Sequence, residues 1–68
     1  MSVYRVIDVI GTSSDSWEAA AKEAVTTAGK SVRDLRVAEV VEQDITLDDS
    51  GGMTFRTKLR VSFKYETS

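Results

Sequence analysis

The chain has 68 residues, 41% of them hydrophobic, a net charge of −2, and neither cysteine nor histidine. This composition excludes disulfides, the usual zinc sites and nucleophile–base pairs built on Cys or His. The negative net charge excludes the strongly basic surface that nucleic-acid binding needs. No segment approaches the roughly 20 apolar residues of a membrane span, and the N-terminus lacks the apolar run of a signal peptide. We therefore expect a cytoplasmic protein without membrane contact.

The short length predicts self-association. A domain of this size buries only about 60% of the surface that its unfolded chain exposes. Disulfides, metals or oligomerisation usually supply the missing stability. With cysteine absent, we expect the chain to be stabilised by copies of itself.

The N-terminal third predicts a strand followed by a helix. Residues 3–10 are rich in Val, Ile and Tyr, which indicates a strand that Gly11 ends. The next residues, 12–16, are of the types that cap helices, and Asp15 with Glu18 three residues later resembles a capping box. We place the start of the helix at about Asp15.

The predicted helix, residues 15–30, carries one narrow apolar stripe. Its side chains recur at helical spacing and are mostly small: Trp17, Ala20, Ala21, Ala24, Val25 and Ala28. Lys30 and Arg33 lie where a helix C-terminus favours cations. The alanines would allow the helix to approach a sheet closely. Trp17 begins the stripe, which favours a packing or subunit-contact role over a ligand platform.

Two long strands, 36–47 and 53–65, are predicted on either side of a turn at residues 48–52. A hairpin centred on Ser50 places apolar pairs on one face and opposite charges on the other. The apolar pairs are Val37 with Phe63, Val41 with Leu59, Ile45 with Phe55 and Leu47 with Met53; the charged pairs are Glu42 with Lys58 and Asp44 with Arg56. The element order is therefore β-α-β-β. One helix covers only part of such a sheet, so the rest is expected to face solvent or other subunits.

Three segments resemble the dodecin family. They are Tyr4–Ser13, similar to the first strand and Gly-Thr-Ser turn, Val37–Val40, similar to the start of the second strand, and Val61–Phe63, similar to the end of the third. The resemblance covers nearly the whole chain, so residues 1–68 are expected to form a single dodecin-like domain. It implies an α+β fold in which a three-stranded antiparallel sheet partly wraps one helix. It also implies a hollow homo-dodecamer that binds, stores or buffers small ligands without catalysis.

The resemblance also identifies a ligand pocket with altered contacts. Typical dodecins stack flavins on a Trp near the start of the second strand, with a Gln on the third strand and an acidic residue nearby. The matching positions here are Val37, Arg56 and Glu42, and Arg36 precedes Val37. A stacked ring contributes roughly 1–3 kcal/mol by analogy with base stacking, which Val37 cannot supply. Arg36, Val37, Glu42 and Arg56 are thus the predicted ligand-binding residues, and FMN or riboflavin is disfavoured.

A metal ion, calcium above all, or a small anion other than flavin is favoured instead, since one branch of the dodecin-like proteins binds calcium. The acidic side chains supply the hard oxygen ligands that calcium takes, although without EF-hand spacing: Glu42, Asp44, Asp48 and Asp49. Oligomer symmetry would bring copies of Glu42 or Asp15 together around an axis, where a cation relieves their mutual repulsion. Glu42 and Asp15 are the predicted metal ligands.

Several alternatives stay open at this point. The chain could store flavin as typical dodecins do, form a ligand-free structural assembly, or use Glu39 or Glu42 as a general base. No nucleophile pair or phosphate loop supports an enzyme, and Glu39 is expected to pair with a base of another subunit. The bases of the third strand either bind an anion or pair with the acids of the second: Arg56, Lys58, Arg60 and Lys64.

The predicted hairpin register conflicts with the resemblance at one place. It puts Val37 and Arg56 on opposite faces of the sheet, whereas dodecins place the matching residues near one ligand. A bulge in a strand, or a pocket shared between protomers, would reconcile the two.

Overall fold

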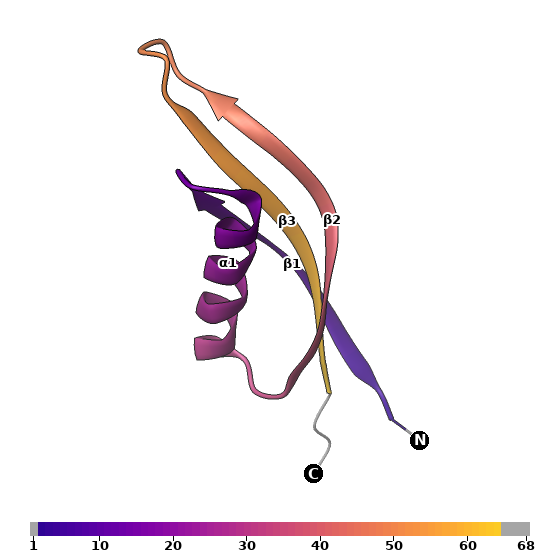
Figure 1. Cartoon of the computed structure of the whole chain (residues 1–68). Coiled ribbons are helices and arrows are strands. Elements are labelled where there is room, and N and C mark those ends of the chain that lie inside the picture. The colour runs from indigo at the N-terminus through magenta and orange to yellow at the C-terminus, as the bar shows by residue number, and fades with distance from the viewer. Residues whose placement is uncertain (1, 65–68) are drawn as a thin grey trace.

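The computed structural model describes residues 2–64, which form a three-stranded antiparallel sheet with one helix against one face (Figure 1). The elements are β1 (Tyr4–Ser13), α1 (Trp17–Ser31), β2 (Leu35–Leu47) and β3 (Met53–Lys64). The strand order is β1-β3-β2, so the last strand of the chain lies in the middle of the sheet. The predicted α+β class and the β-α-β-β order are confirmed.

The boundaries of β1 and α1 differ from those predicted. β1 continues past Gly11 to Ser13, because both residues still pair with β3, so the prediction that Gly11 ends the strand is wrong. The helix N-cap is Ser16, whose hydroxyl accepts a hydrogen bond from the Ala19 N–H at 3.0 Å. Asp15 stays in the preceding loop, where its N–H donates to Ser13 Oγ at 2.9 Å. The helix therefore begins after Asp15.

The core lies between α1 and the central strand β3. Ala20, Ala24 and Ala28 of α1 are buried, as are Leu59 and Val61 of β3. These alanines belong to the predicted apolar stripe, and their small side chains let the helix axis lie close to the sheet. The exposed large apolar side chains in residues 2–64 outnumber these core residues, as the short length leads one to expect.

The hairpin of β2 and β3 pairs as predicted next to its turn. Four predicted pairs are present: Leu47 with Met53, Ile45 with Phe55, Asp44 with Arg56 and Glu42 with Lys58. In the turn, the Asp48 carboxylate accepts hydrogen bonds from the Ser50 N–H at 3.0 Å and the Gly52 N–H at 2.7 Å. Gly51 has a φ of 88°, a conformation that glycine adopts readily. The turn thus uses Asp48 as a local cap.

Beyond Glu42 the pairing shifts at two bulges. The first lies between Val40 and Glu42, where Val41 is the extra residue, so Leu59 faces Val40 and the predicted Val41–Leu59 pair is wrong. At a bulge, two residues of one strand lie opposite one residue of the other. This bends the strand and changes the register beyond it.

The second bulge lies between Leu35 and Val37, with Arg36 as the extra residue. Val37 pairs with Ser62 and Leu35 with Phe63, so the predicted Val37–Phe63 pair is wrong. The predicted end of β3 at residue 65 lies outside the described residues.

The bulge at Val41 decides which face Val37 occupies. Side chains alternate along a strand, so Ser62, the partner of Val37, lies on the same face as Arg56. The prediction that Val37 and Arg56 lie on opposite faces is wrong, because the extra residue Val41 reverses the alternation. We call the sheet side away from α1 the outer face; it carries Tyr4, Val6, Asp8, Ile10 and Thr12 of β1, Val37, Glu39, Glu42 and Asp44 of β2, and Arg56, Lys58, Arg60, Ser62 and Lys64 of β3.

Candidate functional site

The outer face carries a ladder of charges with bases in the middle and acids at both sides. The central strand β3 supplies the bases, and the flanking strands supply the acids. Arg60 lies between Asp8 of β1 and Glu39 of β2, and its guanidinium binds Asp8 with Nε–Oδ1 3.0 Å. Of the four bases of β3, Arg56 and Arg60 form ion pairs within residues 2–64, which favours pairing over anion binding for these two.

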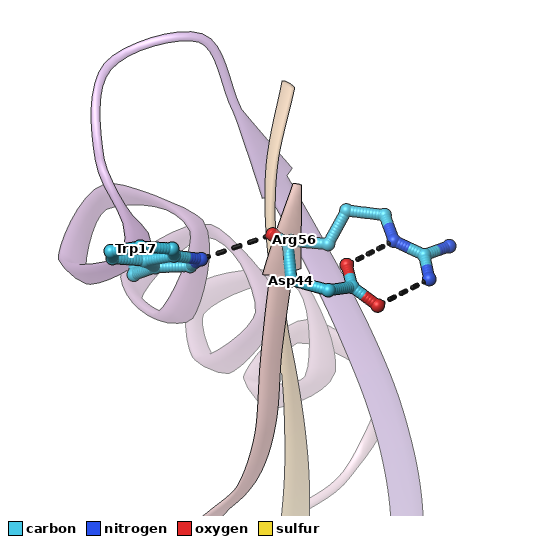
Figure 2. A network of polar contacts seen from close by, with 3 residues as sticks. All are labelled: Trp17, Asp44 and Arg56. Carbon is cyan, nitrogen blue, oxygen red and sulfur yellow. Dashed lines mark hydrogen bonds and ion pairs between the residues drawn. The ribbon is translucent and has the colours of Figure 1, made fainter. Parts of the chain in front are cut away.

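Asp44 and Arg56 form the tightest ion pair of this ladder. Figure 2 shows both guanidinium contacts, Nε to Oδ1 and Nη2 to Oδ2, each 2.7 Å long. The hydrogen bonds from Arg56 lower the pKa of Asp44, and Asp44 in turn raises the pKa of Arg56, with a smaller contribution from Glu42. Such a two-point contact fixes the guanidinium plane. The guanidinium of Arg56 is therefore held by Asp44 of β2.

Trp17 anchors the start of α1 to the same stretch of β2. Its indole Nε1–H donates to the backbone carbonyl of Asp44 at 3.0 Å (Figure 2). The Trp17 ring also meets Phe55 edge-on, with ring centroids 5.2 Å apart. The Thr57 hydroxyl, which is fully buried, donates to the Trp17 carbonyl oxygen at 2.9 Å. Trp17 is thus a packing residue, in agreement with the predicted role.

Glu42 is a carboxylate without an ion pair among residues 2–64. It faces Lys58 across the strands and lies next to a hollow of about 10 Å³, lined also by Ile10, Asp44 and Arg56. This space is about that of a single water molecule. Within one chain the hollow is too small for an organic ligand.

Arg36 and Val37 lie far from this hollow. Val37 is opposite Ser62, six residues along β3 from Arg56, a separation of about 20 Å at the usual strand rise. Arg36 and Val37 line a separate hollow of about 140 Å³ with Leu35. The structure therefore brings Glu42 and Arg56 together, and Arg36 and Val37 together, but it does not join the two pairs within one chain.

Asp15, the other predicted metal ligand, is exposed in the loop between β1 and α1. The carboxylate of Asp44 pairs with Arg56, and that of Asp48 accepts a hydrogen bond from the Gly52 N–H within the turn. Within residues 2–64, no group of three or more acidic side chains is arranged to hold a metal ion. A calcium ion usually takes six to eight oxygens. A site built on Glu42 or Asp15 thus needs further oxygens, from backbone carbonyls, from water or from another chain.

Asp8 is the charged residue of the outer face that the sequence interpretation missed. The sequence interpretation gave Asp8 no role, yet it forms the ion pair with Arg60 across β1 and β3. The available signal was the alternation of Asp8 with Val6 and Ile10, which places all three on one face. The neighbouring strand could not be read from this alternation.

The two ion pairs predict how stability depends on pH. Hydrogen bonds from Arg60 and Arg56 lower the pKa values of Asp8 and Asp44 from 3.8. A lowered folded-state pKa adds stability above the ordinary value, and this stability is lost as the pH falls through the lowered pKa. We expect the urea midpoint to drop as the pH falls from about 5 to about 2, and to drop less in the Asp8→Asn/Asp44→Asn variant.

The expected drop of the urea midpoint is small, because both ion pairs are partly exposed and are screened by salt. Asp49→Asn is the matched control, since Asp49 makes no hydrogen bond or ion pair within residues 2–64. Equal acid sensitivity in the double variant and the control would contradict the prediction.

Comparison with known proteins assigns the chain to a family. The family model described as Dodecin matches residues 3–66. The chain belongs to the dodecin family. The calcium dodecin of Mycobacterium tuberculosis is 62% identical over 64 residues, which are 94% of this chain and 90% of that protein. The dodecin of Thermus thermophilus is 34% identical over 64 residues, covering 94% of this chain and 93% of its own length.

Solved structures agree with this dodecin assignment. The crystal structure of the M. tuberculosis calcium dodecin superposes with a TM-score of 0.90 at 60% identity, covering 98% of this chain and 96% of that chain. That protein is described as calcium-chelating, with a novel calcium-binding site. The described part of the present dodecin has no helix that is long and apolar enough to span a membrane.

Proposed function

We propose that this dodecin is a non-enzymatic, homo-dodecameric protein that binds calcium ions between its subunits and thereby stores or buffers them. The observation that carries the proposal is the 62% identity to a relative named calcium dodecin over 94% of this chain. At this identity the fold is shared, so a similar ion-binding arrangement is expected. The single domain over residues 1–68 and a cytoplasmic location stay predictions.

The donor chemistry of the outer face is compatible with calcium. Glu42, which forms no ion pair within residues 2–64, supplies a carboxylate beside a hollow of about 10 Å³, and carboxylate oxygens are ligands that calcium prefers. Copies of Glu42 or Asp15 that meet at a symmetry axis would repel one another, and a bound cation would remove this repulsion. Glu42 and Asp15 are therefore the residues that we propose to hold the ion.

The flavin alternative is weakened by two features of the outer face. Val37 offers no flat aromatic surface, and the guanidinium of Arg56 is held by Asp44 at 2.7 Å. A flavin edge that needs hydrogen bonds from the Arg56 position would have to compete with this ion pair. We therefore propose calcium in place of flavin.

Calcium binding is testable by calorimetry on the assembled protein. Native mass spectrometry should show twelve subunits with excess mass from calcium, and titration of the apo protein should release or absorb heat. Because calcium affinity depends on the number of charged ligands, Glu42→Gln should weaken binding by about tenfold or more. Asp15→Asn should do the same if it contributes to the same or another site.

The control variant is Glu23→Gln, an exposed helix residue of the same charge change. It should leave the calcium affinity unchanged. Equal affinities for the wild type, Glu42→Gln and Asp15→Asn would reject these ligands. A colourless protein with no heat of calcium binding would reject the calcium proposal, and a yellow protein would support flavin.

A further inference from the structure

Glu42 and Arg56 are close enough to bind each other on the outer face, yet they form no ion pair. Arg56 lies opposite Asp44, and Glu42 lies opposite Lys58, two residues further along β3. Arg56 is thus the diagonal neighbour of Glu42, at a usual separation of about 7–8 Å that a long side chain can span. Both residues line the same small hollow. Distance alone therefore does not keep the guanidinium away from Glu42.

The Asp44 carboxylate supplies the restraint on Arg56. Its two oxygens accept hydrogen bonds from Nε and Nη2, each 2.7 Å long. A contact through these two nitrogens fixes the plane of the guanidinium. Turning Arg56 towards Glu42 would break both hydrogen bonds and leave the Asp44 charge without its partner.

The main chain of Asp44 is held in turn from the other side of the sheet. Figure 2 shows the Trp17 indole on one side of β2 and the Arg56 guanidinium on the other. The indole Nε1–H donates to the Asp44 carbonyl oxygen at 3.0 Å, and the Trp17 ring packs edge-on against Phe55, the residue before Arg56. The start of α1 thus fixes the stretch of sheet from which both members of the ion pair project.

This arrangement decides which cation competes for Glu42. A guanidinium released from Asp44 would offer Glu42 a planar fork of donors that matches a carboxylate at two points. It would then cover the oxygens that calcium takes. With Arg56 held by Asp44, the facing base is Lys58, which forms no ion pair with Glu42 within residues 2–64. The strongly hydrated ammonium of a lysine is the weaker competitor.

We infer that Asp44 is a positioning residue for calcium binding, which holds Arg56 so that the Glu42 carboxylate stays available to the ion. The inference rests on the proposed calcium function and on Glu42 as a ligand. Asp44 acts through Arg56 and does not itself bind the ion. Removal of Asp44 is therefore harmful only while Arg56 is present.

Calorimetric titration of calcium chloride into the assembled, metal-free protein tests this dependence. Asp44→Asn should weaken calcium binding about fivefold or more, since an ion pair of up to about 1 kcal/mol forms in competition with the ion. Asp44→Asn/Arg56→Gln removes the competitor together with its holder and keeps the net charge. Its affinity should return to within about twofold of the wild type. Circular dichroism checks that each variant folds.

Asp8→Asn is the matched control. Asp8 binds Arg60 on the same face and its replacement makes the same change of charge, but the second acid that acts on Arg60 is Glu39 rather than Glu42. The control should leave calcium affinity within about twofold of the wild type, because exposed charges at a distance are screened.

A double variant as weak as Asp44→Asn would overturn the inference and leave the calcium function standing, since Asp44 would then be a ligand itself. Unchanged affinity in Asp44→Asn, or an equal loss in Asp8→Asn, would also overturn it. A wild type that binds no calcium would reject the proposed function and the inference with it.

A crystal structure of the calcium-free Asp44→Asn variant tests the restraint without any ion. The Arg56 guanidinium should lie against the Glu42 carboxylate, within about 3 Å, the usual length of such a hydrogen bond. A guanidinium that stays beside residue 44 or points into solvent would overturn the inference, whatever the calcium affinities are.

Discussion

Gly11→Ala is expected to unfold the protomer, since no space exists for a methyl group where β1 passes under α1. A Cβ at residue 11 would meet the backbone carbonyl of Ala20 and would lie 2.9 Å from the Ala24 Cβ. The obstacle is largely helix backbone, so no side-chain rotation relieves it. Overpacking of a core costs typically 1–3 kcal/mol and sometimes more, and we expect about 3 kcal/mol or more here. One core in a chain this short supplies only about 3–5 kcal/mol.

Urea unfolding followed by circular dichroism measures this loss, and native mass spectrometry shows whether assembly rescues the variant. Gly29→Ala is the matched control. A Cβ there meets only Leu35 Cδ1 at 3.7 Å, an ordinary contact. Alanine is a better helix former than glycine by about 1 kcal/mol, so this variant should be as stable as the wild type or more so. A Gly11→Ala variant of unchanged stability would show that α1 moves away from β1 at little cost.

Val37→Trp/Arg56→Gln is expected to bind riboflavin at least about tenfold more tightly than the wild type. The Trp adds a stacking surface worth roughly 1–3 kcal/mol, which equals about 5- to 150-fold in affinity. The Gln removes the guanidinium that Asp44 holds and offers an amide in its place. Quenching of riboflavin fluorescence measures the affinity.

The bulge at Val41 supplies the control for this experiment. Val40 pairs with Leu59 on the helix-side face, while Val37 lies on the outer face with Arg56. Val40→Trp/Arg56→Gln therefore adds the same ring on the wrong face and should leave riboflavin binding as in the wild type. Because Val37 and Arg56 are about 20 Å apart along one chain, tight binding also requires a second chain. Equal affinity of both double variants would contradict the shared outer-face pocket.

Much of the fold could be predicted from local patterns. The β-α-β-β order follows from a Val/Ile-rich segment, an alanine stripe at helical spacing and two alternating strands around residues 48–52. The pairs next to the turn were also correct, for example Asp44 with Arg56. A turn fixes the register of the residues nearest to it, so charge and apolar alternation suffice there.

A bulge was one of the two arrangements that would bring Val37 and Arg56 onto one face, and the structure has it, but its position was not predicted, although the sequence carries a signal for one of the two bulges. Val40 and Val41 are consecutive apolar residues that break the alternation of β2, and the extra residue is Val41. The alternation alone does not say whether such a break is a bulge or an exposed valine. Because one inserted residue reverses the face of every residue beyond it, the faces of Val37 and Glu39 could not be derived.

The candidate site shows the same division. Local sequence determined which residue types are available: the carboxylates of Glu42 and Asp15, the base Arg56, and valine at residue 37 in place of an aromatic ring. The tertiary structure decided which side chains lie next to them. It placed β3 in the centre of the sheet, so Arg60 pairs with Asp8, more than fifty residues earlier, and Arg56 is held by Asp44. Neighbours across a sheet depend on strand order and bulges, which arise from pairing between segments far apart in the sequence rather than from local periodicity.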